Sequence, residues 1–117
     1  MRIATDGRAT LIMPQTEMGQ GIYTALAMLI AEELDLPLAG VTLEAAPASD
    51  ALYGNPIFKI QATGGSTSIR AYWLPLRKVG ASARTMLVAA AARRWHVPPA
   101  SCRTEDGRVI HDPTGRR

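Results

Sequence analysis

A strand-like segment that runs into a helix-like segment through two closely spaced glycines constrains this fold most. Ala9–Met13 has the apolar and β-prone character of a strand, which Pro14 closes. The next segment, Gly21–Leu36, predicts a helix that Pro37 ends. Its apolar residues recur at helical spacing: Ile22, Leu26, Leu29, Ile30 and Leu34. Together with the alternating segment Val41–Ala45, this order predicts a βαβ unit or another α+β layer.

The first junction, Gln15–Gly21, is a candidate ligand contact. Its two glycines can adopt positive φ and allow close approach of another group. A helix that begins here directs free N–H groups and the positive end of its dipole at the junction, as anion sites do. Gln20 lies between the glycines, so its amide is expected to reach a ligand. The alternative is an ordinary turn, in which Glu17 makes a structural hydrogen bond to the turn.

A second junction, Thr63–Ser68, has a Gly-Gly pair followed by hydroxyl side chains. Such residues cap the free N–H groups of a helix, and they can also cradle a phosphate. The helix predicted after it covers Ser66–Trp95 and bends near Pro75. A narrow apolar face continues along it, at Ala83, Leu87, Ala90 and Ala91. Before this junction, Pro47–Gln61 shows no periodicity and predicts a loop of roughly 15 residues, which is long for a compact domain.

Two Asp-Gly pairs predict β-hairpins, one at Asp6-Gly7 and one at Asp106-Gly107. The predicted fold is therefore α+β, with two main helices on a small mixed sheet. At 117 residues the chain is expected to form a single domain, 1–117.

Composition excludes several classes of protein. The net charge is only +3 and the arginines are dispersed, which is not the clustered basic face of a nucleic-acid-binding protein. No apolar run reaches the roughly 18 residues of a membrane span, and Met1–Gly7 lacks the apolar core of a signal peptide. Cys102 is the only cysteine, so no internal disulfide can form. We expect a cytoplasmic protein, and export of a longer parent stays open.

No catalytic or metal-binding set is predicted. His96 and His111 have no motif spacing to a nucleophile or to candidate ligands, and Cys102 lies in no nucleophile motif. Trp73 and Trp95 fit a core or an interface better than a stacking platform. The residues alone thus indicate a globular domain with two glycine-bearing helix entrances.

Read in order, four motifs resemble a known family. They are Glu17–Gly21, Tyr23-Thr24, Ala31–Leu34 and Thr63–Ser68. Their order and separation resemble the molybdopterin-binding large subunit of the xanthine dehydrogenase/aldehyde oxidase family, in the branch of the isoquinoline 1-oxidoreductase beta subunit. The resemblance continues to Cys102-Arg103 and covers nearly the whole chain.

The resemblance implies an oxidoreductase, a molybdenum hydroxylase that transfers a water-derived oxygen to an N-heteroaromatic compound or an aldehyde. It implies molybdopterin cytosine dinucleotide as the cofactor and iron–sulfur clusters in a small partner subunit. The residues that match the segment at the pterin and its phosphates are Met18, Gly19, Gln20 and Gly21. Those that match the segment at the dinucleotide end are Gly64, Gly65, Ser66 and Thr67.

The chain also departs from the family pattern. It is several times shorter than the family's large subunit, and it lacks both the Gly-Gly-Gly-Phe-Gly loop and the glutamate general base. We therefore expect a fragment that carries part of a cofactor cradle, has no hydroxylase activity alone and self-associates through exposed apolar surface. The alternatives are a small phosphate- or nucleotide-binding module and a purely structural packing or dimerisation domain.

Overall fold

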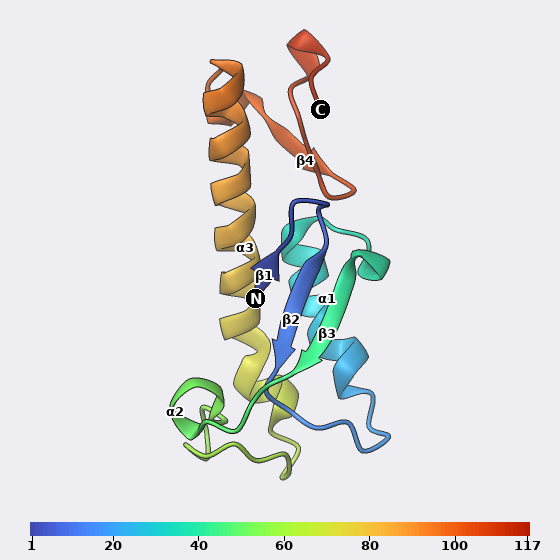
Figure 1. Cartoon of the computed structure of the whole chain (residues 1–117), viewed down its shortest axis with the longest axis vertical. Coiled ribbons are helices and arrows are strands. Elements are labelled where there is room, and N and C mark those ends of the chain that lie inside the picture. Colours follow the sequence, from blue (N-terminus) through green and yellow to red (C-terminus); the bar gives the residue numbers. More distant parts are fainter.

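The computed structural model describes residues 1–117 and shows an α+β fold, as predicted. Figure 1 shows the arrangement, with α1 behind the sheet and α3 alongside both. The elements are β1 (Arg2–Ile3), β2 (Ala9–Met13), α1 (Ile22–Leu34), β3 (Val41–Ala45), α2 (Asp50–Tyr53), α3 (Ser68–Trp95), β4 (Arg103–Glu105) and β5 (Arg108–Ile110). Three short 3-10 turns join them: η1 (Leu38–Gly40), η2 (Pro99–Ser101) and η3 (Asp112–Thr114).

The main sheet is mixed and has the order β1-β2-β3. β1 and β2 form the antiparallel hairpin predicted at Asp6-Gly7, and β2 pairs with β3 in parallel, with Ala9 opposite Val41. The predicted βαβ unit is therefore confirmed, with α1 as its crossover. Alternate residues of β2, namely Ala9, Leu11 and Met13, are buried beneath α1, as the period of two in a strand requires.

α1 ends at Leu34, short of the predicted Leu36. Asp35 adopts a left-handed conformation, with φ 54°, and its N–H bonds the carbonyl of Glu32. The N–H of Leu36 returns to the carbonyl of Ala31, which completes a C-terminal cap of the Schellman type. The cap, rather than Pro37, ends the helix.

α3 is one continuous helix through Pro75, and it begins at Ser68 rather than at the predicted Ser66. Figure 1 shows its first turns inclined to the rest, which agrees with the predicted bend. Its main contacts are with α1 rather than with the sheet, and Ala71, Tyr72 and Leu76 complete the core. The sequence predicted that both main helices pack on the sheet. In the structure α1 packs on the sheet, and α3 packs mainly on α1.

The apolar face predicted along α3 packs only in part. Ala83 lies against the core, whereas Leu87 and Ala90 are exposed. The buried alanine of the last turns is Ala92. Beyond the length of α1 the helix has few elements to pack against, so the pattern of small residues there does not correspond to a buried face.

The segment 47–61 is more ordered than predicted, because it contains α2 and a tight turn around a buried asparagine. Asn55 is fully buried, its N–H bonds the carbonyl of Ile60 at 2.7 Å, and its carbonyl accepts the N–H of Lys59 at 2.8 Å. Its side-chain oxygen accepts the N–H of Ile57 at 2.9 Å. The segment is therefore an ordered loop, and the hydrogen bonds of Asn55 stabilise its turn.

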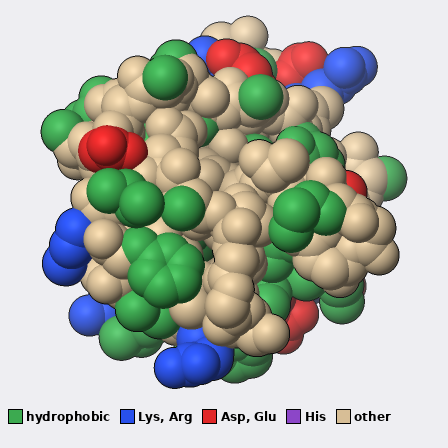
Figure 2. All heavy atoms as spheres, turned by 90° about the horizontal axis from the view of Figure 1, so that it is seen from below, with side chains coloured by type: hydrophobic (Ala, Val, Ile, Leu, Met, Phe, Trp, Pro, Cys, Tyr) green, Lys and Arg blue, Asp and Glu red, His purple; other side chains and the backbone are tan.

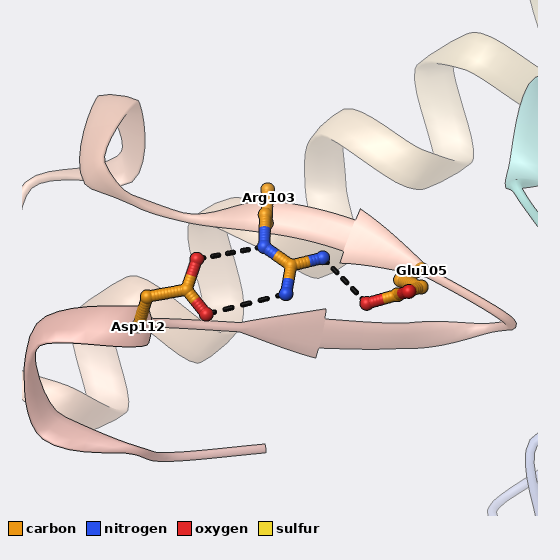
Figure 3. Close-up of polar contacts among 3 residues, drawn as sticks. All are labelled: Arg103, Glu105 and Asp112. Carbon is orange, nitrogen blue, oxygen red and sulfur yellow. Dashed lines mark hydrogen bonds and ion pairs between the residues drawn. The ribbon is translucent and has the colours of Figure 1, made fainter.

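The second hairpin, β4–β5, forms at Asp106-Gly107 as predicted, and both turn residues have positive φ, 49° and 73°. The N–H of Gly107 donates to the carbonyl of Asp35, so the hairpin is tied to the end of α1. Figure 3 shows the guanidinium of Arg103 between Asp112, at 2.7 and 3.2 Å, and Glu105, at 2.6 Å. These contacts with Arg103 lower the pKa of the Asp112 carboxyl.

Candidate functional site

The two glycine junctions, 47 residues apart in sequence, lie side by side at the carboxyl ends of β2 and β3, at the lower end of Figure 1. The hydroxyl of Ser68 donates to the side-chain oxygen of Gln15 at 2.7 Å. The N–H of Thr16 donates to the hydroxyl of Thr63 at 2.9 Å. The structure therefore brings together the two segments that the sequence singled out.

In the first junction the carboxylate of Glu17 occupies the start of α1. One oxygen accepts the N–H groups of Gly19 at 2.8 Å and Gly21 at 2.9 Å, and the other accepts that of Tyr23 at 3.0 Å. These bonds, of which those from Tyr23 and Gly21 contribute most, lower the pKa of Glu17. The structural hydrogen bond expected of Glu17 is confirmed, and the start of α1 already holds an anion.

The amide of Gln20 folds back on its own loop. Its oxygen accepts the N–H of Met18 at 2.5 Å, and its nitrogen donates to the carbonyl of Thr16 at 2.9 Å. Contact of this amide with a ligand requires one of these bonds to open. Met18 is 67% exposed. Gly19 and Gly21 have φ of 93° and 77°, and a Cβ atom added at either position would have no heavy atom within 4 Å. The loop thus presents an open surface of backbone and one thioether side chain.

The second junction differs in its hydrogen bonding. Thr67 is buried, and its hydroxyl donates to the carbonyl of Gly64 at 2.8 Å and accepts the amide of Asn55 at 2.9 Å. Gly65 and Ser66 are exposed and have positive φ, 58° and 51°. The side chain of Ser66 is free to contact a ligand, whereas the buried hydroxyl of Thr67 stabilises the loop through its own hydrogen bonds.

From Gly65 to Arg70, five backbone N–H groups donate to no other group of the chain. They belong to Gly65, Ser66, Ser68, Ile69 and Arg70. At the first junction Glu17 has taken the corresponding donors. Unpaired N–H groups at the positive end of a long helix favour an anion such as a phosphate.

A cleft of about 500 Å³ adjoins the junctions, between the first loop and the ends of β2 and β3. Its lining includes Gln15, Thr16, Met18 and Thr63. Figure 2 views this end of the molecule: backbone and uncharged polar side chains occupy the middle of the face, and apolar side chains gather beside it. In sheets with parallel strands, ligands bind beyond the carboxyl ends of the strands, which is where this cleft lies.

Two residues have roles that the sequence does not predict. Gln15 is the first residue of the candidate junction Gln15–Gly21, but nothing in the sequence indicates that its side chain is buried, and Asn55 is not distinguished from the rest of the predicted 47–61 loop. Both are buried, at 3% and 0% exposure, and both join the junctions to the rest of the loops.

A family model described as "Molybdopterin cofactor-binding domain" matches residues 1–117. The chain belongs to the molybdopterin cofactor-binding domain family. The resemblance drawn from the glycine motifs is thereby confirmed.

Three curated relatives extend the comparison. The chain is 43% identical over 112 residues to the beta subunit of isoquinoline 1-oxidoreductase of Brevundimonas diminuta, covering 95% of this chain and 14% of that protein. It is 35% identical over 113 residues to a nicotinate dehydrogenase subunit of Pseudomonas putida, covering 92% and 9% respectively. It is 35% identical over 100 residues to a membrane-bound aldehyde dehydrogenase (pyrroloquinoline-quinone) of Gluconacetobacter polyoxogenes, covering 86% and 12%. The chain spans about a seventh or less of the length of these proteins.

This molybdopterin-binding domain contains groups that fit such a cofactor. The free N–H groups at the start of α3 suit its phosphate, and the cleft lined by Met18 and Thr63 offers room for another part of the cofactor. Gly64 has no heavy atom within 4 Å of a built Cβ, so its surface is open to an approaching group. None of the helices combines the length and apolar character needed to cross a bilayer.

Proposed function

We propose that this chain is part of the cofactor cradle of a molybdenum hydroxylase. The family match supports molybdopterin as the ligand, and the names of the relatives describe oxidoreductases and dehydrogenases. The observation that carries the proposal is the row of unpaired N–H groups at the start of α3, a row that begins two residues after Thr63 in the cleft wall.

In this proposal the two junctions bind different parts of the cofactor. The backbone of Gly64, Gly65 and Ser66, with the hydroxyl of Ser66, binds the phosphates and the dinucleotide end. The loop from Met18 to Gly21 lies against the pterin and orients it. When bound, the cofactor supplies the redox-active molybdenum through which oxygen from water reaches the substrate carbon. The chain itself binds and positions, and we assign no catalytic residue to it.

The wider assembly follows from the same proposal. We propose the cytosine dinucleotide form of the cofactor, a small iron–sulfur subunit as the electron-accepting partner, and an N-heteroaromatic compound or an aldehyde as substrate. The chain would be one segment of a longer large subunit, inactive as a hydroxylase alone and located in the cytoplasm, with no nucleic-acid partner. A small nucleotide-binding module and a structural packing domain are the rival functions.

The first experiment is to purify the complete polypeptide that carries this chain and to measure its bound molybdenum and cytosine nucleotide. We expect both, in amounts close to that of the polypeptide. Pyrroloquinoline quinone is measured in parallel, because one relative carries it in its name. An active, intact protein that contains neither molybdenum nor a pterin would contradict the proposal. Tight nucleotide binding without molybdenum would support the rival module.

The site is tested by adding side chains where the fold has room for them. Gly64→Val suits this purpose, since Gly64 has no left-handed φ and no neighbour within 4 Å of a built Cβ. Gly65→Val is less clean, because Gly65 has positive φ and its Cβ would lie 3.3 Å from Phe58. We expect folded Gly64→Val and Gln20→Ala proteins with reduced molybdenum, and full molybdenum in the control Ala4→Val at an exposed turn. Normal molybdenum and turnover in both site variants would show that the junctions are only turns.

A further inference from the structure

We propose that Gln15 is a positioning residue that holds the two cofactor loops in one fixed arrangement. The inference rests on the proposed function, because it assigns to Gln15 the relative placement of the segments that would contact the cofactor. Gln15 itself is 3% exposed.

The side-chain amide of Gln15 spans the boundary between the loops. Its nitrogen donates to the carbonyl of Pro14 at 3.1 Å and to the carbonyl of Ala62 at 3.2 Å. Its oxygen accepts the hydroxyl of Ser68 at 2.7 Å. One side chain therefore binds the residue after β2, the residue before the second junction and the first residue of α3.

These bonds fix the geometry strongly because they are buried. A buried amide that loses its partners is left without hydrogen bonds and without water, so alternative placements of the loops are costly. No buried side-chain nitrogen or oxygen of the chain lacks a partner. The arrangement of the two loops is thus fully satisfied in one geometry.

Other contacts between the loops are weaker candidates for this role. The bond from Thr16 to Thr63 is a single contact, and Thr16 is exposed. Asn55 supports the second junction through Thr67 but does not touch the first loop. The coupling therefore depends mainly on Gln15 and its partner Ser68.

The test uses the complete polypeptide with Gln15→Met, which keeps the length of the side chain and removes all three hydrogen bonds. Ser68→Ala removes only the hydrogen bond between the Ser68 hydroxyl and Gln15, and it is the second test variant if Gln15→Met folds poorly. The control is Leu34→Ala, which destabilises the buried far end of α1 without touching either loop. Thermal stability, molybdenum content and the rate of cofactor release are measured for each protein, together with amide hydrogen exchange of Thr67 and Ala71 in the cofactor-free form, because their N–H groups donate to the carbonyls of Gly64 and Thr67.

We expect Gln15→Met to release the cofactor roughly tenfold faster, the lower range for residues that orient ligand-contacting groups. We also expect faster exchange of the Thr67 and Ala71 amides, although the substitution lies on the other loop. Leu34→Ala should lose thermal stability and keep the wild-type release and exchange rates. Wild-type release, or wild-type exchange of the Thr67 and Ala71 amides, in both Gln15→Met and Ser68→Ala would overturn the inference. A wild-type protein without molybdopterin would instead contradict the proposed function, while the exchange measurement would still report on the coupling.

Discussion

Single residues make the two helix entrances chemically different. Glu17 places a carboxylate at the positive end of α1 and accepts three backbone N–H groups there. No acidic side chain bonds the corresponding donors at the start of α3. An approaching phosphate meets a negative charge at the first entrance and unpaired donors at the second. The sequence indicated a candidate anion site at each junction, with an ordinary turn and a helix cap as the alternatives, whereas the hydrogen bonds favour the one at Gly65–Arg70.

The lowered pKa of Glu17 has a consequence for stability in acid. A carboxyl whose pKa is lower in the folded state stabilises that state above its unfolded value, and the contribution is lost as the pH falls through the folded pKa. Glu17→Gln removes this contribution. We therefore expect the variant to melt at a lower temperature than the wild type at neutral pH, and the difference to shrink below the ordinary pKa of 4.5. Melting curves of both proteins from pH 7 to pH 3 test this; a constant difference at all pH values would contradict it.

We predict that Asn55 contributes most to the stability of the ordered loop 47–61. It is fully buried, and its amide bonds Thr67 and the N–H of Ile57. Asn55→Ala leaves the N–H of Ile57 without a partner and removes one of the two hydrogen bonds of the Thr67 hydroxyl, and we expect a loss of about 1–3 kcal/mol in the free energy of unfolding. Chemical denaturation measures the loss, and Ser49→Ala is the control, since no hydrogen bond uses its hydroxyl. Equal stability of Asn55→Ala and the wild type would show that water replaces the lost bonds.

At the scale of elements, the contact between α1 and α3 holds the fold together. Gly80 of α3 lies so close to α1 that a Cβ would meet the Cβ of Glu33 at 2.8 Å and the carbonyl of Ile30 at 3.2 Å. Beside it, Arg77 bonds the Glu33 carboxylate at 2.6 Å, and its guanidinium lies 5.3 Å from the ring centre of Trp73. A missing side chain and an ion pair thus set the distance between the helices.

Gly80→Ala tests this contact, because two effects oppose each other. Alanine is favoured over glycine within a helix by about 1 kcal/mol. The added methyl group, however, meets a Cβ and a carbonyl that cannot rotate away, and overpacking of this kind costs about 1–3 kcal/mol. We expect net destabilisation in chemical denaturation. The control Ser82→Ala, at an exposed position of the same helix, should be neutral or slightly stabilising; stabilisation by Gly80→Ala would show that the helices move apart freely.

The elements were predictable where local pattern decides them. β2 and β3 have the predicted bounds, because alternation and flanking Pro14 mark them. The end of α1 was missed because a non-glycine residue, Asp35, adopts the left-handed conformation of the cap. The Gln15–Ser68 bond could not be predicted, since it depends on how distant loops meet in three dimensions. A structural hydrogen bond from Glu17 to the turn was expected, but the sequence did not show that its carboxylate accepts three N–H groups of the first junction. The motifs named the candidate residues, and only the structure showed which of them face inward.

At the scale of the whole molecule, the chain is elongated and leaves much apolar surface uncovered. It measures 50 × 25 × 22 Å. Its radius of gyration is 16.0 Å, against roughly 13 Å for a compact domain of this length. A groove of about 640 Å³ beside α1 and α3 is lined largely by apolar residues that include Met28 and Trp73. The proposed longer subunit would account for these surfaces, since its remaining segments could cover them.

The apolar residues of the Ala51–Ile60 segment carry the last prediction. They are exposed, as expected from the sequence: Leu52 by 78%, Ile57 by 47%, Phe58 by 42% and Ile60 by 52%. Contiguous apolar patches of this kind drive association. We expect the 117-residue chain alone to self-associate in sedimentation equilibrium, and a dimer with exchanged elements is one form this would take.

Leu52→Lys should weaken this association, because it places a charge in the most exposed part of the patch. Ala51→Lys adds the same charge one residue earlier, also at an exposed position of α2, and removes little apolar surface. A larger effect of Leu52→Lys than of Ala51→Lys would therefore assign the association to apolar contact rather than to net charge. Equal effects would assign it to charge, and a wild-type monomer at high concentration would show that the exposed residues do not drive association in the isolated chain.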